Sequence, residues 1–248
     1  MVRPDAADPP RNRLLSGLPA FDRERLLARA RLADLPGGAV LADLPGASPG
    51  DVVFAESGLI GLHLAGPDGT RIGLGSVSDD MAVGLAQSLS GLPFATTAVV
   101  ECPGRAWIVD ATTLRAAHAD SPAVRDMVLR CAAVYATLIA ENMLCNATHT
   151  VPQRMARWIA TYRRRTGGDT CRVMQEYLSA YFSVKRTTVT QAGLSLSRAN
   201  LIAYSRGSLT VLDPDGLDRA SCGCDRRLAE KVNRIFACAS GVLAPGPA

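Results

Sequence analysis

The stretch Gln175–Val211 constrains the fold of this chain most, because it predicts two short helices, a tight turn and a β-hairpin in succession. The small Ser179 stands where the two helix backbones must approach each other. The inner faces of these helices are predicted to carry Leu178, Phe182, Val184, Val189 and Ala192. Beyond them, Leu201–Tyr204 and Ser208–Leu212 flank a Ser205-Arg206-Gly207 turn and predict a two-stranded wing.

The outer face of the second predicted helix carries polar side chains of long reach. They are Lys185, Arg186, Thr187, Thr190 and Gln191. Such side chains can contact phosphates and base edges in the major groove of DNA. An ordinary helical hairpin with a solvated basic face would show the same short pattern. The attached wing favours the DNA-binding interpretation.

At these residues the sequence resembles the CRP/FNR family of bacterial transcription regulators. The matching pieces are Gln175-Glu176, Val184-Lys185-Arg186, Thr188-Val189-Thr190, Arg198-Ala199-Asn200-Leu201-Ile202 and Tyr204-Ser205-Arg206-Gly207, within a resemblance that runs from about Asn12 to about Phe236. It implies that Arg186, Thr187 and Gln191 read bases and that Thr188 contacts a phosphate. The expected DNA-binding set is Gln175, Lys185, Arg186, Thr187, Thr188, Thr190, Gln191 and Arg206. The implied partners are double-stranded DNA, a second copy of the chain and RNA polymerase.

Four residues depart from the usual pattern of that family. Met174 has no side-chain oxygen to cap the first helix, and Ser183 would be strained by a left-handed backbone in the turn. Gly193 inside the second helix costs roughly 1 kcal/mol relative to Ala, and Ser208 replaces a basic wing residue. Met174, Ser183 and Gly193 motivate an alternative function, a ligand- or redox-sensing dimeric module with degenerate DNA binding.

The net charge of +4 is unevenly distributed along the chain. Residues 1–150 carry 12 Arg against 16 acidic residues, a net −4, whereas residues 151–248 carry 13 Arg and 2 Lys against 7 acidic residues, a net +8. A basic C-terminal part that includes the helix–turn–helix is expected of a protein that binds the phosphate backbone. Surface charge that serves only solubility is the alternative.

Upstream, short apolar stretches separated by Gly, Pro and Asp predict an antiparallel barrel or roll. They are Ala39–Leu41, Val52–Phe54, Leu59–Leu64, Arg71–Leu74, Ala98–Cys102 and Ala106–Val109, with a hairpin turn at Pro67-Asp68-Gly69. Two short helices that break at Pro19 are expected in Arg13–Ala33. The resemblance implies a cyclic-nucleotide-binding-like β-roll. The predicted fold class is α+β, with this roll, a long dimerisation helix and a C-terminal winged helix–turn–helix.

Cyclic-nucleotide-binding members of the family hold the cyclic phosphate with an Arg and a Ser or Thr in a short helical cassette. The corresponding stretch, Ser76–Val99, contains neither Arg nor Lys, and its Asp79-Asp80 pair would repel an anion. We therefore expect no binding of cAMP or cGMP. Either an unknown small-molecule effector binds in the roll, or the roll is a structural module.

A long helix is expected to begin at Asp120-Ser121-Pro122, a capping residue followed by an early proline. An apolar a/d heptad, broken at Glu141, runs along it: Val124, Met127, Cys131, Val134, Leu138 and Cys145. Such a stripe could pack on the roll. The family resemblance implies that it pairs with a second copy in a parallel homodimer, and two recognition helices would then read a near-palindromic site.

A capping box at Thr150-Val151-Pro152-Gln153 predicts the next helix, Val151–Arg165, with Met155, Trp158, Ile159 and Tyr162 inside. Arg163-Arg164-Arg165 at its end either contact phosphates or are solvated. A final helix is predicted in Asp215–Phe236. The expected divisions are a disordered tail (1–12), the roll (13–119), the dimerisation helix (120–149), the DNA-binding domain (150–238) and a loose tail (239–248).

The seven cysteines raise the question of a metal or redox centre. None precedes Cys102, which argues against an N-terminal iron–sulfur cluster, and Cys222-Gly223-Cys224 with Cys238 has unusual zinc spacing. A small metalloprotein is therefore a secondary alternative, as is heme ligation by His63 or Cys102. His149 is expected to be solvated or to join a dimer-interface hydrogen bond. The primary expectation is no metal site and no cofactor.

Sequences typical of enzymes are not found in the chain: there is no Walker loop, no HExxH and no GxSxG. We therefore predict no catalytic residues and no enzymatic activity. Residues 1–13 lack the apolar segment of a signal peptide, and no run of about 18 apolar residues is evident. A cytoplasmic protein without membrane contact is expected.

Overall fold

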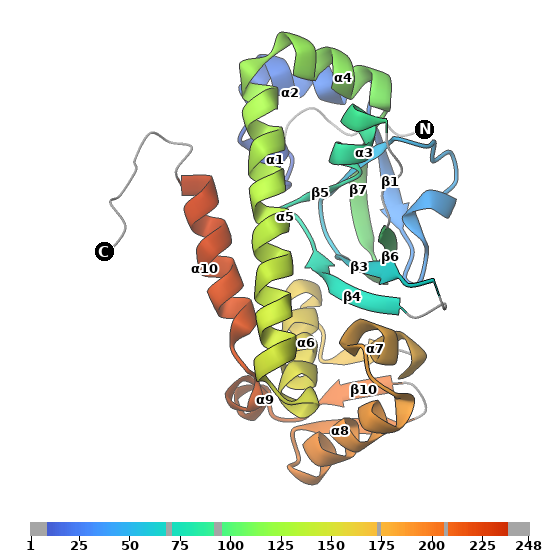
Figure 1. The fold of residues 1–248 in the computed structure, drawn as a ribbon, viewed down its shortest axis with the longest axis vertical. Coiled ribbons are helices and arrows are strands. Elements are labelled where there is room, and N and C mark those ends of the chain that lie inside the picture. The colour runs from blue at the N-terminus through green and yellow to red at the C-terminus, as the bar shows by residue number, and fades with distance from the viewer. Residues whose placement is uncertain (1–8, 68–70, 92–95, 173–174, 206–207, 238–248) are drawn as a thin grey trace. The chain divides into compact units, whose positions relative to one another are not determined.

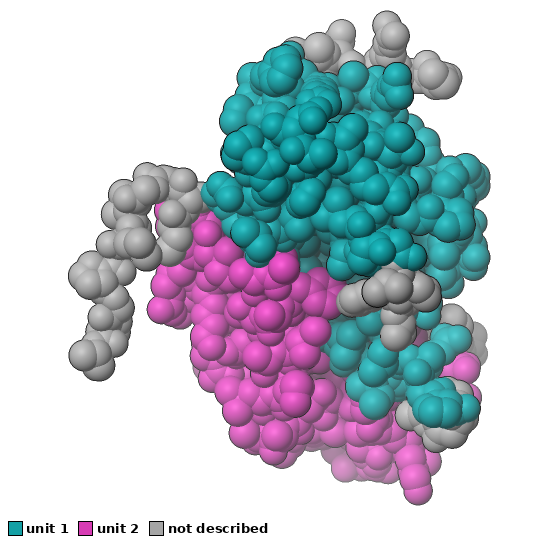
Figure 2. Space-filling view, turned by 45° about the horizontal axis from the view of Figure 1, so that its top comes forward, with its two compact units in different colours: residues 1–131 teal, residues 132–248 magenta. Residues whose placement is uncertain are grey.

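The computed structural model describes residues 9–67, 71–91, 96–172, 175–205 and 208–237. The chain divides into two compact units, residues 1–131 and 132–248 (Figure 1, Figure 2). The boundary falls inside one long helix, α5 (Pro122–Thr148). Most of the two predicted tails, the predicted hairpin tip at Asp68-Gly69, and Met174, Arg206 and Cys238 lie outside the described residues.

Unit 1 contains two antiparallel sheets among its described residues. In the first, the strand order is β1-β7-β2-β5, formed by β1 (Arg31–Leu35), β7 (Gly104–Val109), β2 (Val52–Ala55) and β5 (Ala82–Val83). In the second, the order is β4-β3-β6, formed by β4 (Arg71–Val77), β3 (Leu59–Ala65) and β6 (Thr96–Cys102). Side chains from β2 and the first part of β3 are buried, which matches the apolar stretches of the sequence.

Short helices accompany the strands of unit 1: α1 (Arg13–Ser16), α2 (Ala20–Leu27), the 3₁₀ turn η1 (Leu41–Asp43), α3 (Leu85–Ser90) and α4 (Ala111–Asp120). Asn12 fixes the first of them to the roll. Its carboxamide oxygen accepts hydrogen bonds from the amides of Leu14 and Leu15, and its nitrogen donates to the carbonyls of Ala55 and Met81. Because Asn12 is fully buried, it acts as both a helix cap and a structural tie.

Two local predictions for unit 1 were wrong, and one helix was missed. Arg31–Ala33, expected in a helix, belongs to β1, because pairing with Ala106–Ile108 of β7 overrides the local helical pattern. The expected strand Ala39–Leu41 instead gives an isolated bridge at Val40 and then enters η1. Helix α4 was not predicted, although Asp110 caps it by accepting a hydrogen bond from the amide of Thr113.

Unit 2 begins with the C-terminal part of α5 and continues with α6 (Val151–Thr166). The predicted capping box is present, since Thr150 and Gln153 bond each other's backbone amides, and Gly167 ends α6 with a left-handed backbone. Next come α7 (Gln175–Phe182) and α8 (Arg186–Arg198). The wing has three strands in the order β8-β10-β9: β8 (Thr170–Arg172), β10 (Ser208–Val211) and β9 (Ile202–Ser205). The predicted hairpin is β9–β10, and β8 was not predicted.

The predicted final helix is divided in two, α9 (Pro214–Ala220) and α10 (Cys224–Ala237). Asp213 caps α9 by accepting a hydrogen bond from the amide of Gly216. Between the helices, Gly223 has a φ of 70°, a left-handed backbone that turns the chain before α10 begins. Buried Glu141 of α5 forms ion pairs with Arg227 and Lys231 and so fixes α10 along α5.

Candidate DNA-binding surface

The turn between α7 and α8 is formed by Ser183, Val184 and Lys185. The amide of Ser183 donates to the carbonyl of Ala180, and that of Val184 donates to the carbonyl of Ser179. Ser183 has a φ of 56°, which is the left-handed backbone that is expected to strain a serine in this turn. The turn places α8 across α7 with Leu178, Phe182 and Val189 buried between them, as the apolar pattern predicts.

Arg154 of α6 supports this turn from below. Its guanidinium donates to the carbonyl of Phe182, the last residue of α7, at 2.7 Å and lies 5.4 Å from the centre of the Phe182 ring. A cation at a helix C-terminus satisfies a free carbonyl and interacts favourably with the helix dipole. Arg154 is only 5% exposed, so the sequence pattern, which assigned only apolar residues to the inner face of α6, missed it.

The face of α8 opposite the core is exposed at most of the predicted positions. Lys185, Arg186, Thr187 and Gln191 are exposed, whereas Thr188 and Thr190 are half-buried. The hydroxyl of Thr190 donates to the carbonyl of Arg186, so it is used inside the helix. Gln175 at the start of α7 is also half-buried. The predicted residues near the start of α8 therefore form one accessible polar surface.

Gly193 lies inside α8, where glycine is unfavourable for an isolated helix. A Cβ atom at this position would lie 3.4 Å from the ring of Tyr204 in β9 and 3.7 Å from the side chain of Met155 in α6. These are ordinary van der Waals distances, so the space around Gly193 would accept an alanine. The packing of α8 against the wing and α6 therefore does not require glycine at this position.

The arginines at the end of α6 contact acidic neighbours. Arg163 pairs with Asp169 at 2.5 Å, and Arg164 pairs with Asp218 at 3.1 Å and with Asp225. These pairs join α6 to the loop before β8 and to α9 and α10. Solvent exposure screens such pairs and limits their strength. We do not assign Arg163 or Arg164 to the DNA-binding surface.

The residues of the predicted dimer stripe are buried in a single copy of the chain. Val124, Met127, Cys131, Val134, Leu138 and Cys145 are each 5% exposed or less in a single copy of the chain. Two contacts show their direction: the thiol of Cys131 donates to the carbonyl of Ala82 in β5, and Cys145 Sγ lies 3.6 Å from Cys222 Sγ. These bulky residues therefore face their own copy, where burial gains more than it would for alanine.

A second heptad stripe lies two residues further along α5, about 200° around the helix. It consists of Leu129, Ala133, Ala136, Ala140, Met143 and Ala147, all exposed, with Leu129 at 69% and Met143 at 68%. We call this set the exposed stripe. Alanines spaced in this way let a second helix approach closely.

Among the described residues, α5 is also the one helix long and apolar enough to cross a membrane, by length and composition alone.

Burial keeps two titratable groups of unit 1 neutral near neutral pH. Burial lowers the pKa of His63 to about 4, with a further contribution from nearby Arg71. Burial also raises the pKa of the Cys131 thiol to about 11, so that this thiol is unreactive near neutral pH. In the stretch that corresponds to the phosphate-binding cassette of cyclic-nucleotide-binding relatives, the carbonyl of Asp79 accepts a hydrogen bond from the amide of Arg13, and the carboxylate of Asp80 accepts one from the amide of Ser78.

A helix–turn–helix with its polar helix exposed and a three-stranded wing defines a winged helix–turn–helix protein, the class to which many transcription regulators belong. Residues 153–220 match the model of the Crp-like helix-turn-helix domain. The chain carries this domain on the fold of CRP/FNR-family transcription regulators. The predicted fold class and the predicted resemblance are thereby confirmed.

Solved structures with this fold come from several bacteria. A regulator of the CRP/FNR family from Eubacterium rectale has a TM-score of 0.67 and 17% identity, over 84% of this chain and 96% of that one. One from Thermus thermophilus has a TM-score of 0.61 and 18% identity, over 77% and 98%. The c-di-GMP-responsive regulator CLP of Xanthomonas campestris has a TM-score of 0.62 and 14% identity, over 79% and 100%. No curated protein matches the chain in sequence.

Proposed function

We propose that the chain is a sequence-specific DNA-binding transcription regulator that acts as a homodimer in the cytoplasm. The observation that carries this proposal is the exposed start of α8, where Lys185, Arg186 and Thr187 stand clear of the packed core. In winged helix–turn–helix proteins the N-terminal part of the second helix enters the major groove. Gln191, one turn further on and also exposed, completes the surface.

Arg186 is the residue that we assign to base reading. Its guanidinium can donate two parallel hydrogen bonds to a guanine, and the exposed amide of Gln191 can pair similarly with an adenine. We assign Lys185 and Thr188, which are close to Arg186 in the sequence, to phosphate contacts. Arg206 would add a contact from the wing tip, and Gln175 one from the start of α7.

The exposed stripe of α5 is our proposed dimer contact, in place of the buried residues that the sequence indicated. Its centre consists of Ala133, Ala136 and Ala140, so two such helices could pack at short distance along a two-fold axis. Dimerisation would supply the second recognition helix that a near-palindromic site needs. RNA polymerase is the further partner of a regulator that activates transcription.

The roll is proposed to sense something other than cAMP or to serve as a structural module. No cation is available between residues 76 and 99 to neutralise a cyclic phosphate. The c-di-GMP-responsive regulator of Xanthomonas campestris has the same fold, so this fold accommodates other effectors. An effector in the roll would act by shifting the population of two dimer arrangements.

The proposal is tested by selecting duplexes from a random pool and measuring affinity at two salt concentrations. We expect a near-palindromic sequence to be enriched and its affinity to fall steeply with salt. Arg186→Ala should cost roughly 1–3 kcal/mol on the selected site and relax its sequence preference. Arg198→Ala, which removes the same charge from the exposed far end of the same helix, is the matched control and should change the preference little.

Two results would count against this assignment. Equal loss of affinity on every sequence would make Arg186 a phosphate contact instead of a base contact. No enrichment by an intact dimer would favour the sensing module with degenerate DNA binding.

A further inference from the structure

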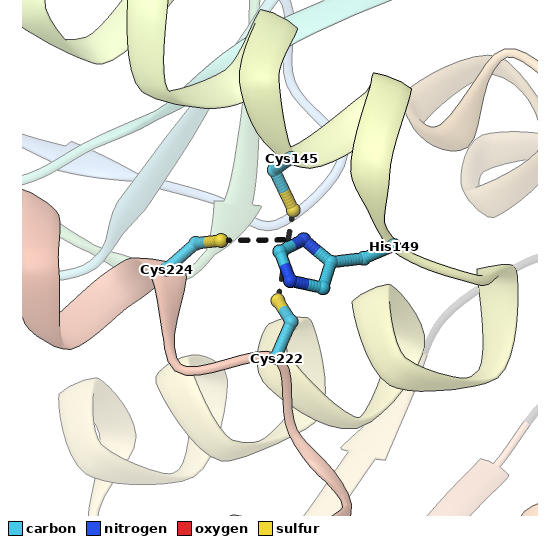
Figure 3. Close-up of side chains that lie close together, drawn as sticks. All are labelled: Cys145, His149, Cys222 and Cys224. Carbon is cyan, nitrogen blue, oxygen red and sulfur yellow. Dashed lines mark hydrogen bonds between the residues drawn. The ribbon is translucent and has the colours of Figure 1, made fainter.

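Three cysteines and one histidine of unit 2 converge on one point. The ligand atoms of Cys145, His149, Cys222 and Cys224 all lie within 4.8 Å of one another. Figure 3 shows the imidazole of His149 among the three sulfur atoms. Cys145 and Cys224 are 0% and 1% exposed, whereas His149 and Cys222 are half-buried. The cluster is therefore largely but not completely shielded from solvent.

Local backbone geometry aims these side chains at each other. Cys145 and His149 are four residues apart, and the amide of His149 donates to the carbonyl of Cys145, so both lie on one face at the end of α5. Gly223, with its left-handed φ of 70°, turns the chain so that both flanking thiols point toward this face. Cys224 opens α10, where the helix dipole favours a thiolate.

The spacing of the atoms fits a tetrahedral ion. Cys145 Sγ lies 3.6 Å from Cys222 Sγ, and Cys224 Sγ lies 3.6 Å from His149 Nδ1. Zinc bonds of about 2.3 Å to sulfur and about 2.0–2.1 Å to nitrogen would set tetrahedral ligand atoms roughly 3.5–3.8 Å apart. A hydrogen-bonded thiol pair would explain one such contact. It would not explain four soft donors that meet from two segments 73 residues apart, His149 and Cys222.

The neighbouring cations match the charge of such a centre. Zinc bound by three thiolates and a neutral imidazole has a net charge of about −1. Arg227 donates to Cys224 Sγ at 3.4 Å, and buried Arg157 interacts electrostatically with Cys145, Cys222 and Cys224. Hydrogen bonds and charges of this kind around the ligands stabilise thiolate centres. Harder ions such as Mg²⁺ and Ca²⁺ prefer oxygen ligands, which this set lacks.

We propose that Cys145, His149, Cys222 and Cys224 bind one zinc ion as a structural Cys₃His site. The ion ties the C-terminal end of α5 to the start of α10, next to the ion pairs of Glu141 with Arg227 and Lys231. The sequence analysis expected no metal site. It grouped Cys222-Gly223-Cys224 with Cys238, which lies outside the described residues, and did not connect them with Cys145 and His149. The site goes beyond the proposed DNA-binding function and does not depend on it.

The first test is elemental analysis of the full-length protein purified under reducing conditions with zinc in the medium. We expect about one zinc per chain, and a wild-type protein that takes up no zinc on reconstitution overturns the proposal. The double variant Cys222→Ala, Cys224→Ala should lose stoichiometric zinc. Cys171→Ala, which removes a buried cysteine of the same unit outside the cluster, should retain it. Loss of zinc from Cys171→Ala, or its retention by the double variant, would place the ion elsewhere.

Two measurements keep the proposal testable if the double variant does not fold. Cobalt-substituted wild-type protein should show intense visible absorption of a tetrahedral site together with thiolate-to-cobalt charge transfer. A weak octahedral spectrum would exclude the Cys₃His site. A strong chelator should lower the melting temperature of wild-type protein, and added zinc should restore it. A Cys145–Cys222 disulfide found by mass spectrometry in the reduced preparation would replace the metal site with a redox pair.

Discussion

At the residue scale, α8 is flanked on both sides by a non-glycine residue with a left-handed backbone. Ser183 before the helix and Asn200 after it both have a φ of 56°. Asn tolerates this conformation better than Ser, because its short amide can bond locally. The conformation of Ser183 is held by a hydrogen bond from its own amide to the carbonyl of Ala180 and by one from the amide of Val184 to the carbonyl of Ser179. The hydrogen bond from Arg154 to the carbonyl of Phe182 supports the same turn. The turn that positions Arg186 is therefore over-determined and slightly strained.

Ser183→Gly is predicted to stabilise unit 2. Glycine removes the steric cost of the left-handed backbone, about 1–2 kcal/mol, but loses part of that gain through the greater freedom of the unfolded chain. The expected increase in the free energy of unfolding is about 0.5 kcal/mol, measured by denaturant titration. Asn200→Gly has the same φ and should gain less. A larger gain at Asn200 than at Ser183 would contradict this account.

A site can be predicted from the sequence when its residues lie close together along the chain. The polar residues of α8 recur at helical spacing within one short segment, so the sequence pattern alone predicts which of them are exposed. Arg154 and the zinc ligands could not be identified in this way. Cys145 meets Cys222, 77 residues away, and no local period links them. Residues that lie far apart in the sequence but meet at one site can be identified only from the folded structure.

At the element scale, α5 is a correctly predicted helix that offers two candidate dimer interfaces. Its sequence contains two heptad stripes, one of bulky residues and one of mostly alanines with Leu129 and Met143. The stripe of bulky residues is the more hydrophobic of the two. It therefore gains more free energy from burial, and in a single copy of the chain it is the buried one. The β-strands were easier to predict, because alternation and turn residues mark them locally. Strand β1 was the exception, since only its pairing with β7 distinguishes it from helix.

The pairing of α5 with α10 predicts a pH dependence of stability. Burial raises the pKa of Glu141, but hydrogen bonds from Lys231 and Arg227 and their charges outweigh it, so its pKa lies below the ordinary 4.5. A carboxylate with a lowered folded-state pKa stabilises the fold fully above the unfolded value. This stabilisation is lost as the pH falls through the lower, folded-state pKa. Unit 2 should therefore lose stability below about pH 4.5.

Glu141→Gln isolates this contribution in urea unfolding at a series of pH values. The variant should be less stable than wild type near pH 7, and the difference should shrink below pH 4.5 as wild-type Glu141 takes up its proton. Glu230→Gln, on the exposed side of α10, is the matched control and should differ little from wild type throughout. A difference between Glu141→Gln and wild type that does not change with pH would show that the effect is one of packing.

At the scale of the whole molecule, the two units place different demands on α5. In unit 1, Val124, Met127 and Cys131 are buried in the fold. In unit 2, Glu141 and Cys145 join α5 to α10 and its preceding loop. The exposed stripe contributes to neither set of contacts and is the surface that we propose for a second copy. The high mean hydropathy of α5, 1.4 over its most apolar window, follows from having two apolar sides.

Introducing charge into the exposed stripe is therefore predicted to separate the two copies without unfolding either. Ala136→Glu would place a carboxylate from each copy at the shared axis, where neither has a partner. Burying an unpaired charge is costly, so the dimer dissociation constant should rise roughly 100-fold, or about 2.7 kcal/mol, measured by analytical ultracentrifugation. Circular dichroism and the melting temperature of the isolated copy should change little, because Ala136 is exposed there.

The matched control is Ala229→Glu, which adds the same charge to an exposed alanine of α10. It should leave the dissociation constant unchanged. Val134→Ala tests the buried stripe, and since Val134 is 2% exposed, it should lower the melting temperature and spare dimerisation. The reverse pattern, with Val134→Ala dissociating the dimer and Ala136→Glu leaving it intact, would return the interface to the bulky stripe. Loss of dimerisation in Ala136→Glu should also lower the affinity for a near-palindromic duplex to the weak affinity for a single half-site, since each recognition helix remains folded.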